Sequence, residues 1–245
     1  MTCNASIVLY HTPEAEVKHI EQLLRESGVV GHIRLIDNSL PGKNIGYGAA
    51  HNIALRESIA QGADYHLVLN SDIDFAPEHI RTLLDYMQAH EDVALIQPKI
   101  YYGDGTLQRN CKRLPTPLDV FGRRFLPNSC MRKRNARYEM HETGYDHTMN
   151  VPYLSGCFML LRVSVLKEVG LFDERFFMYP EDIDLTRRLH QRYQTLFYPE
   201  VSITHNHQKA SYHSMRMLWI HCINMIRYFN KWGWILDKER KQFNP

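Results

Sequence analysis

The 245-residue sequence predicts an α/β protein with a mostly parallel, Rossmann-like central sheet flanked by helices. Two observations predict this class: short apolar runs alternate with segments of helical periodicity, and polar clusters follow the apolar runs. We expect strands at 6–10, 33–36 and 65–69, and helices at 13–27, 46–60 and 77–90. Strands that alternate with helices pair in parallel, so this half forms one α/β unit.

The individual elements have local reasons. The runs SIVLY and YHLVL are short and apolar, as strands of such a sheet are. The third helix starts with Pro77 in its first turn, where a missing backbone N–H costs nothing. In the second half, CFMLLR within 152–162 indicates a buried strand, followed by a short helix from Ser164, a helix over 180–193 and a strand over 195–198.

Composition excludes several classes of protein. The formal charge of +2 gives no reason to expect nucleic acid as a partner. The five cysteines form no C-x-x-C pair, so we expect reduced thiols in a cytoplasmic setting rather than disulfides or structural zinc. We also expect neither a secretion signal nor a membrane span, because no long apolar run occurs.

A basic stretch interrupts the regular pattern. Between 107 and 138 there are nine Lys or Arg residues and one acid, Asp119, and no clear periodicity, so we expect a mobile basic insert over 106–150. Such an insert could bind a diphosphate-bearing lipid or an anionic membrane leaflet, or it could be a solvated loop.

Polar clusters follow two of the predicted strands, where open α/β sheets bind their ligands. One is Asp37-Asn38-Ser39 and the other is NSDIDF at 70–75. In an extended segment Asp72 and Asp74 would share a face, and such a pair suits a hard cation such as Mn²⁺ or Mg²⁺. Alternatively they form a turn and cap for the next helix, and Asp37 either accepts from a base N–H or closes an Asx turn.

Three further motifs have both a chemical and a structural interpretation. NIGYGAAHN at 44–52 offers close backbone approach and a helix N-terminus to an anion, or is an ordinary helix entry. In YPEDID at 179–184, acids at a helix start are stabilised by about 0.3–1 kcal/mol, but one of them could act as a general base. His205 or His207 could complete a metal shell with Asp74, or be structural.

Taken in order, six motifs resemble family 2 glycosyltransferases of the GT-A fold, in the bacterial surface-polysaccharide branch that includes rhamnosyltransferases. The similarity extends over about 5–213. The motifs are IDNS at 36–39, NIGYGAAHN at 44–52, LNSDIDF at 69–75, QPKIYYGDGTLQ at 97–108, LSGCFMLLR at 154–162 and GLFDERFFMYPEDIDLTRR at 170–188.

The resemblance implies an inverting transferase that uses Mn²⁺ or Mg²⁺. It implies a dTDP-rhamnose or UDP-sugar donor, and an acceptor hydroxyl on a growing surface glycan or a polyprenyl-diphosphate-linked oligosaccharide. Asp182 would be the catalytic base. The implied metal ligands are Asp74, His205 and Asp72; the implied donor ligands are Asp37, Asn38, Asn44, Gly46, Asn52 and Asp72; the implied acceptor ligands are Ser155, Gly156 and Glu181.

The resemblance also sets the expected organisation. We expect a GT-A domain over 1–211, with a nucleotide-binding half at 1–105 and an acceptor and catalytic half at 151–211, followed by a helical arm at 212–245. The arm has apolar residues at helical spacing, which suits core packing, a homodimer or peripheral contact with the inner membrane face. One departure from the family is Val8-Leu9-Tyr10-His11, which replaces the usual opening at the base site.

Two other functions fit part of these observations. A non-catalytic nucleotide-sugar-binding subunit would keep the fold without turnover. A nucleotidyltransferase would need a glycine-rich phosphate loop after the first strand, and none follows 6–10.

Overall fold

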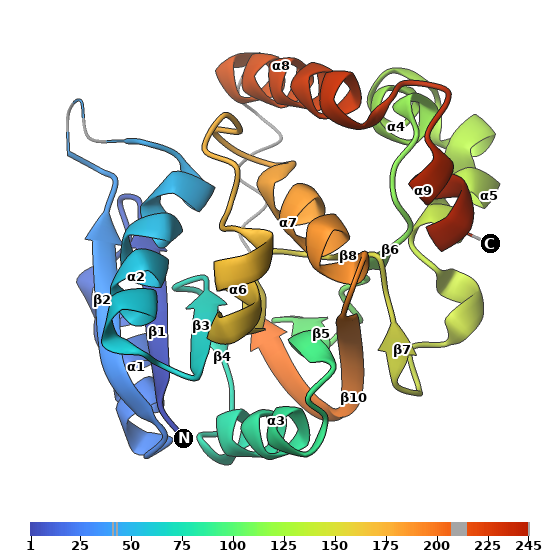
Figure 1. Cartoon of the computed structure of the whole chain (residues 1–245). Coiled ribbons are helices and arrows are strands. Elements are labelled where there is room, and N and C mark those ends of the chain that lie inside the picture. Colours follow the sequence, from blue (N-terminus) through green and yellow to red (C-terminus); the bar gives the residue numbers. More distant parts are fainter. Residues whose placement is uncertain (41, 43, 207–214, 245) are drawn as a thin grey trace.

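A twisted central sheet organises the chain in the computed structural model, which describes residues 1–40, 42, 44–206 and 215–244 (Figure 1). In these residues the strand order is β2-β1-β3-β9-β5-β10-β4, with β7 beside β10. Strands β1, β2, β3, β5 and β10 share one direction, whereas β9, β4 and β7 run against it. The strands are β1 (Cys3–Leu9), β2 (Val30–Asp37), β3 (Tyr65–Leu69), β4 (Ile73–Asp74), β5 (Val93–Tyr102), β7 (Met149–Asn150), β9 (Phe158–Arg162) and β10 (Gln194–His205).

Helices cover both faces of this sheet. Side chains of α1 and α3 share a core cluster with β1 residues such as Ile7, and side chains of α2, α6 and α7 share a second cluster with Val68. In β3, Leu67 and Leu69 face the first cluster and Val68 the second, which explains its uninterrupted apolar run. The helices are α1 (Glu14–Glu26), α2 (Tyr47–Gln61), α3 (Glu78–Ala89), α6 (Val163–Val169) and α7 (Glu181–His190).

The predicted α/β class with a mostly parallel sheet is confirmed, and β3 has the predicted bounds. Strand β5 is not among the predicted strands, because Gln97 and Pro98 interrupt its apolar run. Its buried Gln97 amide donates to the backbone carbonyls of Ser155 and Phe158, at 2.6 and 2.7 Å, which satisfies the polar group inside the sheet.

The basic insert contains several helices. The expectation of an irregular stretch was therefore wrong. It contains a π-helical turn η1 (Leu118–Gly122), α4 (Arg123–Phe125), α5 (Asn128–Tyr138) and a 3-10 turn η2 (His141–Thr143). A two-stranded sheet ties the insert to the site: β6 (Cys111–Lys112) pairs antiparallel with β8 (Tyr153–Leu154). The periodicity is weak because the polar, basic helix α5 buries one side chain, Met131.

The C-terminal arm packs on the rest of the chain, and in Figure 1 its helix α8 lies along the top of the molecule with α9 below it at the right. It comprises α8 (Met215–Trp232) and α9 (Lys238–Phe243). Its side chains Met225, Tyr228 and Phe229 form a third core cluster with Tyr153 and Ile183. The predicted boundary at 211–212 and the candidate His207 lie outside the described residues.

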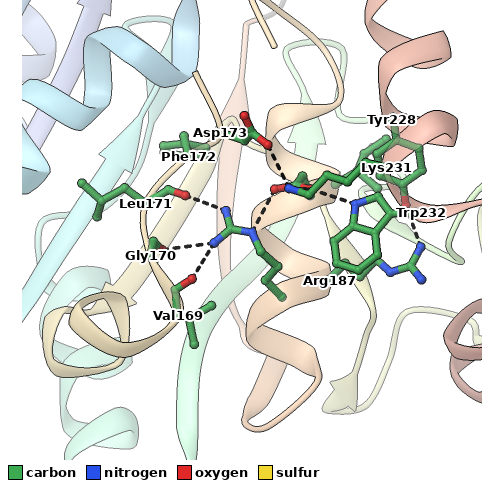
Figure 2. A network of polar contacts seen from close by, with 12 residues as sticks. Val169, Gly170, Leu171, Phe172, Asp173, Arg187, Tyr228, Lys231 and Trp232 are labelled. Atoms are coloured by element: carbon green, nitrogen blue, oxygen red, sulfur yellow. Dashed lines mark hydrogen bonds and ion pairs between the residues drawn. The ribbon is translucent and has the colours of Figure 1, made fainter. Parts of the chain in front are cut away.

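Polar contacts join the arm to α7. The Arg187 guanidinium lies 2.6 Å from Asp237, and both side chains are at most 2% exposed. Asp184 of α7 pairs with Arg188, which also donates to the carbonyls of Val169, Gly170 and Leu171. Figure 2 shows Lys231 and Trp232 of α8 reaching into this network.

Candidate active site

The carboxyl ends of the parallel strands border a cavity of about 520 Å³. Tyr10 and His11 after β1, Asn70 and Asp72 after β3, and Asn206 after β10 are among the residues that line it. Figure 1 shows β2 pointing toward the side of the molecule on which α8 lies, so the site and the arm share that side. The departure from the family opening at Val8–His11 therefore forms part of the cavity wall.

The residues after β2 form a small hydrogen-bonded shelf beside α2. Asp37 is exposed, and its Oδ1 accepts from the Ser39 N–H at 2.7 Å. The Asn38 side chain is buried; its Nδ2 donates to the Gly46 carbonyl at 3.2 Å, and no described residue donates to its Oδ1. Asn44 Oδ1 accepts from the Gly46 N–H at 3.1 Å. Within the described residues, the shelf therefore contains a buried acceptor oxygen at Asn38 Oδ1 that has no hydrogen-bond partner.

Gly46 connects this shelf to the loop before α7. Its φ is +90°, and a Cβ there would lie 2.3 Å from the Phe177 carbonyl oxygen. The next residue, Tyr47, donates its N–H to the same oxygen at 3.1 Å. Only glycine fits this contact.

A carboxylate and an imidazole meet at the end of the cavity. Asp72 Oδ1 lies 3.1 Å from His205 Nε2, and the His205 side chain is 4% exposed. Gln108 Oε1 lies 2.9 Å from the other ring nitrogen of His205, Nδ1, and fixes the orientation of the ring. Burial alone would lower the pKa of His205, but hydrogen bonds with Asp72 and Cys157 raise it to about 10.

This pair fits a divalent cation. An oxygen ligand beside an imidazole suits Mn²⁺ or Mg²⁺, and the proton on Nε2 would be displaced because ligands bind deprotonated. In the described part of the chain no three His, Cys, Asp or Glu side chains form a metal-binding group. Two protein ligands are sufficient for an ion that also takes water and substrate phosphates.

Asp74 has different contacts. Asp72 lies in the turn before β4, whereas Asp74 lies in β4 opposite Thr204. Asp74 Oδ1 is 3.3 Å from His19 Nε2 of α1, and about half of the Asp74 side chain is exposed. Of the two aspartates, Asp72 is thus the one that contacts His205, and metal binding by Asp72 and by Asp74 stays a prediction.

Asp182, in the first turn of α7, is held by three hydrogen-bond donors. Its Oδ2 accepts from the Gly156 N–H at 2.9 Å and the Tyr153 hydroxyl at 3.4 Å, and its Oδ1 accepts from the Ile183 N–H at 2.7 Å. Burial raises the pKa of Asp182 to about 6, although the Gly156 hydrogen bond and the charge of Lys112 act in the opposite direction. The carboxyl group is thus poised to exchange a proton near neutral pH.

Glu181 lies beside it in a drier environment. Its side chain is 4% exposed, and no described group pairs with Oε2. Burial and the neighbouring charge of Asp182 hold the pKa of Glu181 well above its usual range. Of two adjacent buried carboxyl groups, Asp182 is therefore the one that ionises first.

A chain of contacts joins Asp182 to Asp72. The Tyr47 hydroxyl lies 2.7 Å from the Gly156 carbonyl and 3.1 Å from Asn70 Oδ1, and Asn70 Nδ2 lies 3.4 Å from His205 Nε2. Gly156 thus contacts Asp182 through its N–H and Tyr47 through its carbonyl. Acids 110 residues apart in the sequence are brought to one site.

Two predicted ligands have structural contacts instead. The Asn52 side chain is 1% exposed and bonds the Phe172 backbone in both directions, at 2.9 and 3.0 Å, so it braces the loop before α7. The Ser155 carbonyl accepts from Gln97 and holds the turn that presents Gly156. Direct substrate contacts from Asn52 and Ser155 stay predictions.

Sequence reasoning missed several residues of the site. Tyr47 and Asn70 lie inside recognised motifs, and their position there was the available signal. No sequence signal pointed to Tyr153 and Lys112, because their position in the site depends on the pairing of β6 with β8.

Comparisons with known proteins identify the family of the chain. Residues 4–228 match the family described as Glycosyltransferase like family 2. An N-acetylglucosaminyl-diphospho-decaprenol L-rhamnosyltransferase of Mycobacterium tuberculosis is 32% identical over 181 residues, covering 67% of this chain and 57% of that protein. Rhamnosyltransferase WbbL of Escherichia coli K12 is 29% identical over 200 residues, covering 77% of this chain and 72% of WbbL.

Solved structures share the fold at low sequence identity. GalNAc-T7 with UDP, GalNAc and Mn²⁺ has a TM-score of 0.58 and 14% identity, covering 98% of this chain and 50% of that one. The mannosyltransferase PcManGT of Pyrobaculum calidifontis with GDP-Man and Mn²⁺ has a TM-score of 0.54 and 14% identity, covering 92% and 64%. The fold is therefore GT-A, and the chain belongs to glycosyltransferase family 2, in its rhamnosyltransferase-like branch.

Proposed function

We propose that the protein transfers a sugar, with inversion, from a nucleotide-diphosphate donor to a hydroxyl of a bacterial surface glycan or lipid-linked oligosaccharide. A dTDP-rhamnose or UDP-sugar donor fits the resemblance. The observation that supports transfer most directly is the contact chain from Asp182 through Gly156, Tyr47 and Asn70 to His205. This chain supports the proposal because it connects Asp182, the proposed proton acceptor, with the residues proposed to bind the donor diphosphate.

In this mechanism Asp182 takes the proton from the acceptor hydroxyl as that oxygen attacks the anomeric carbon. The donors Gly156 and Ile183 fix the orientation of the carboxylate, so it need not reorganise during the reaction. The neutral form of Glu181 keeps a second negative charge away from the attacking oxygen. Attack on the side opposite the leaving diphosphate inverts the anomeric configuration.

The protein's own ligands for a cation are Asp72 and His205 in this proposal, with Gln108 orienting the imidazole. A bound Mn²⁺ or Mg²⁺ supplies positive charge that neutralises the departing diphosphate. Asp74, implied by the resemblance, remains a candidate ligand beside His19. The Mn²⁺ named in the two solved relatives supports a divalent ion of this kind.

The acceptor proposal draws on the relatives. The name of the mycobacterial relative specifies a sugar linked through diphosphate to decaprenol. This chain spans 57% of that protein's length, so its acceptor is carried over here as a proposal. An acceptor of that class stays at a membrane while its sugar enters the site.

The exposed face of α8 suits peripheral membrane contact. Met215, Trp219, Ile223 and Ile226 recur at helical spacing and are 70, 65, 44 and 42% exposed. The helix contains no acid, and Arg216 and Arg227 beside this stripe are exposed. Apolar side chains bordered by cations favour the surface of an anionic bilayer, and α8 lies on the same side of the molecule as the site (Figure 1).

A second part of the chain agrees with this placement. The insert adds the exposed Phe125, Leu126 and Arg124, and Arg124 lies near His221 of α8. None of the described helices is long and apolar enough to cross a bilayer. From the exposed residues of α8 and the insert we propose a peripheral enzyme at the cytoplasmic membrane face; a homodimer through the arm is the competing use of the same stripe.

The experiment that tests the function replaces Asp182 by Asn. Transfer should fall by several orders of magnitude while calorimetric binding of the donor nucleotide with Mn²⁺ stays within about twofold, because Asp182 acts on the acceptor. Asp146→Asn, at an exposed carboxylate, is the matched control. Unchanged transfer in Asp182→Asn would reject the assignment, and donor binding without any transfer in the wild type would favour a nucleotide-sugar-binding subunit.

A further inference from the structure

Lys112 lies next to the proposed catalytic base. It is the cross-strand partner of Tyr153 in the small sheet of β6 and β8. Its Nζ lies 5.2 Å from the centre of the Tyr153 ring, and the Tyr153 hydroxyl donates to Asp182 Oδ2 at 3.4 Å. The ammonium of Lys112 therefore lies over the ring of the tyrosine whose hydroxyl donates to Asp182.

This ammonium has no hydrogen-bond or ion-pair partner in residues 1–40, 42, 44–206 and 215–244, although the residue is half-buried. A lysine carries three donors, and partly burying them without acceptors is costly. Burial lowers the pKa of Lys112, and the nearby Arg123 acts in the same direction, whereas Asp182 and Glu139 oppose it. Such an ammonium group can bind an anionic group of an incoming substrate.

Arg123 brings a second cation to this position. It belongs to α4 of the basic insert, and its guanidinium pairs with Glu139 at 2.7 Å while 39% of the side chain stays exposed. Glu139 also contacts His141 at 3.1 Å. Arg123 thus lies close enough to Lys112 for its charge to lower the pKa of that ammonium.

Contacts from Asp182 lead in two directions. Through Gly156 and Tyr47 they reach Asn70 and the proposed donor diphosphate site. Through Tyr153 they reach Lys112 and the insert. The cations on the second route are therefore separate from the ligands proposed for the donor.

We propose that Lys112, supported by Arg123, binds a phosphate oxygen of an acceptor whose sugar is linked through phosphate. This inference rests on the proposed function in taking Asp182 as the base. In such an acceptor the phosphate is one sugar ring away from the hydroxyl that reacts. Lys112 lies over the ring of Tyr153, whose hydroxyl donates to Asp182, so it can contact that phosphate while the acceptor hydroxyl lies at the base. The basic insert would then help to select the acceptor.

The test compares two soluble acceptors that have the same N-acetylglucosamine and the same short alkyl chain. One is linked through diphosphate and the other directly, as a simple glycoside. Lys112→Met should raise KM for the diphosphate acceptor by about 10- to 100-fold, the equivalent of one charged hydrogen bond. It should leave KM for the glycoside and for the donor within about twofold, and Lys112→Arg should retain most of the affinity.

Lys99→Met is the matched control, since Lys99 also lies over a tyrosine, Tyr101, at 5.9 Å. Calorimetric binding of both acceptors in the presence of dTDP and Mn²⁺ gives a readout that needs no turnover. If the diphosphate acceptor binds more tightly than the glycoside, loses that advantage in Lys112→Met and yet is not glycosylated, the subsite stands and the proposed transfer fails.

Three results would overturn the subsite. One is equal binding of both acceptors to the wild type. Another is an equal loss for both acceptors in Lys112→Met, which would mean a general effect on the site. The third is a raised donor KM with unchanged acceptor KM, which would move Lys112 to the donor.

Discussion

The indole Nε1 of Trp232 donates a 2.8 Å hydrogen bond to Oδ1 of Asp184, two residues after the proposed base on α7. Lys231 contacts the same oxygen at 2.6 Å, and Asp184 is fully buried. The C-terminal arm thus holds the helix that carries Asp182, so its packing is part of the site.

Breaking the arm's buried ion pair should unfold the protein at a lower temperature. Arg187→Met leaves the buried Asp237 with only its longer ion pair to Arg240, at 3.8 Å, and loss of a buried ion-pair partner costs about 3–5 kcal/mol. For a chain of this size that lowers the melting temperature by about 6–20 °C in a calorimetric scan. Arg25→Met breaks an exposed pair with Glu21 and should cost about 0–1 kcal/mol. Similar shifts for both variants would show that the arm does not stabilise the domain.

Transfer should depend on pH through Asp182. Because burial raises the pKa of this carboxyl group to about 6, kcat/KM should rise with pH up to about 6 and then level off as the base loses its proton. Lys112 favours the ionised carboxylate, so Lys112→Met should move this limb to higher pH, and Lys99→Met should not. If kcat/KM instead rose with pH around the ordinary pKa of an aspartate, the result would contradict a buried Asp182 as the base.

Metal dependence should follow Asp72 more than Asp74. Loss of a partner outside the metal shell already weakens metal binding by about 10- to 100-fold, and loss of a ligand should weaken it at least as much. We expect Asp72→Asn to raise the Mn²⁺ concentration for half-maximal transfer by at least about 10-fold, and Asp74→Asn to have the smaller effect. A larger effect at Asp74 would restore the assignment that the resemblance implies.

Membrane contact should require the exposed stripe of α8. The wild type should float with phosphatidylcholine vesicles that contain phosphatidylglycerol, and less with phosphatidylcholine alone. Trp219→Ser with Ile223→Ser should abolish flotation and leave transfer to a soluble acceptor unchanged. Met1→Ser, an exposed apolar residue outside the arm, can be tested as the control after placing a new initiator before it.

The same double variant separates membrane contact from dimerisation. Light scattering on the eluting protein should give a monomer mass for both forms. A dimer that becomes a monomer in Trp219→Ser with Ile223→Ser, with no flotation of the wild type, would assign the stripe to a second copy of the chain.

Much of the first half could be predicted because its signals are local. The apolar run of β3 and the polar cluster after it are contiguous, so both the strand and the site edge follow from short segments. Asp182 was placed by a motif at the start of α7, and the structure keeps it there. These features depend on residues close in sequence.

The remaining features depend on distant pairing. The antiparallel direction of β9 follows from its pairing with β3 and β5, which no local pattern encodes. The pair Arg187–Asp237 spans 50 residues, and the different contacts of Asp72 and Asp74 arise from a turn where an extended segment was expected. Lys112 reaches the site only because β6 pairs with β8.

The requirement for glycine at position 46 has an implication for protein engineering. The Phe177 carbonyl occupies the space where any Cβ at 46 would sit, and it also receives the N–H of Tyr47. Segments 44–47 and 170–178 therefore form one interlocking unit although more than a hundred positions separate them. Chimeras between homologues that exchange one of these segments must transplant the other with it.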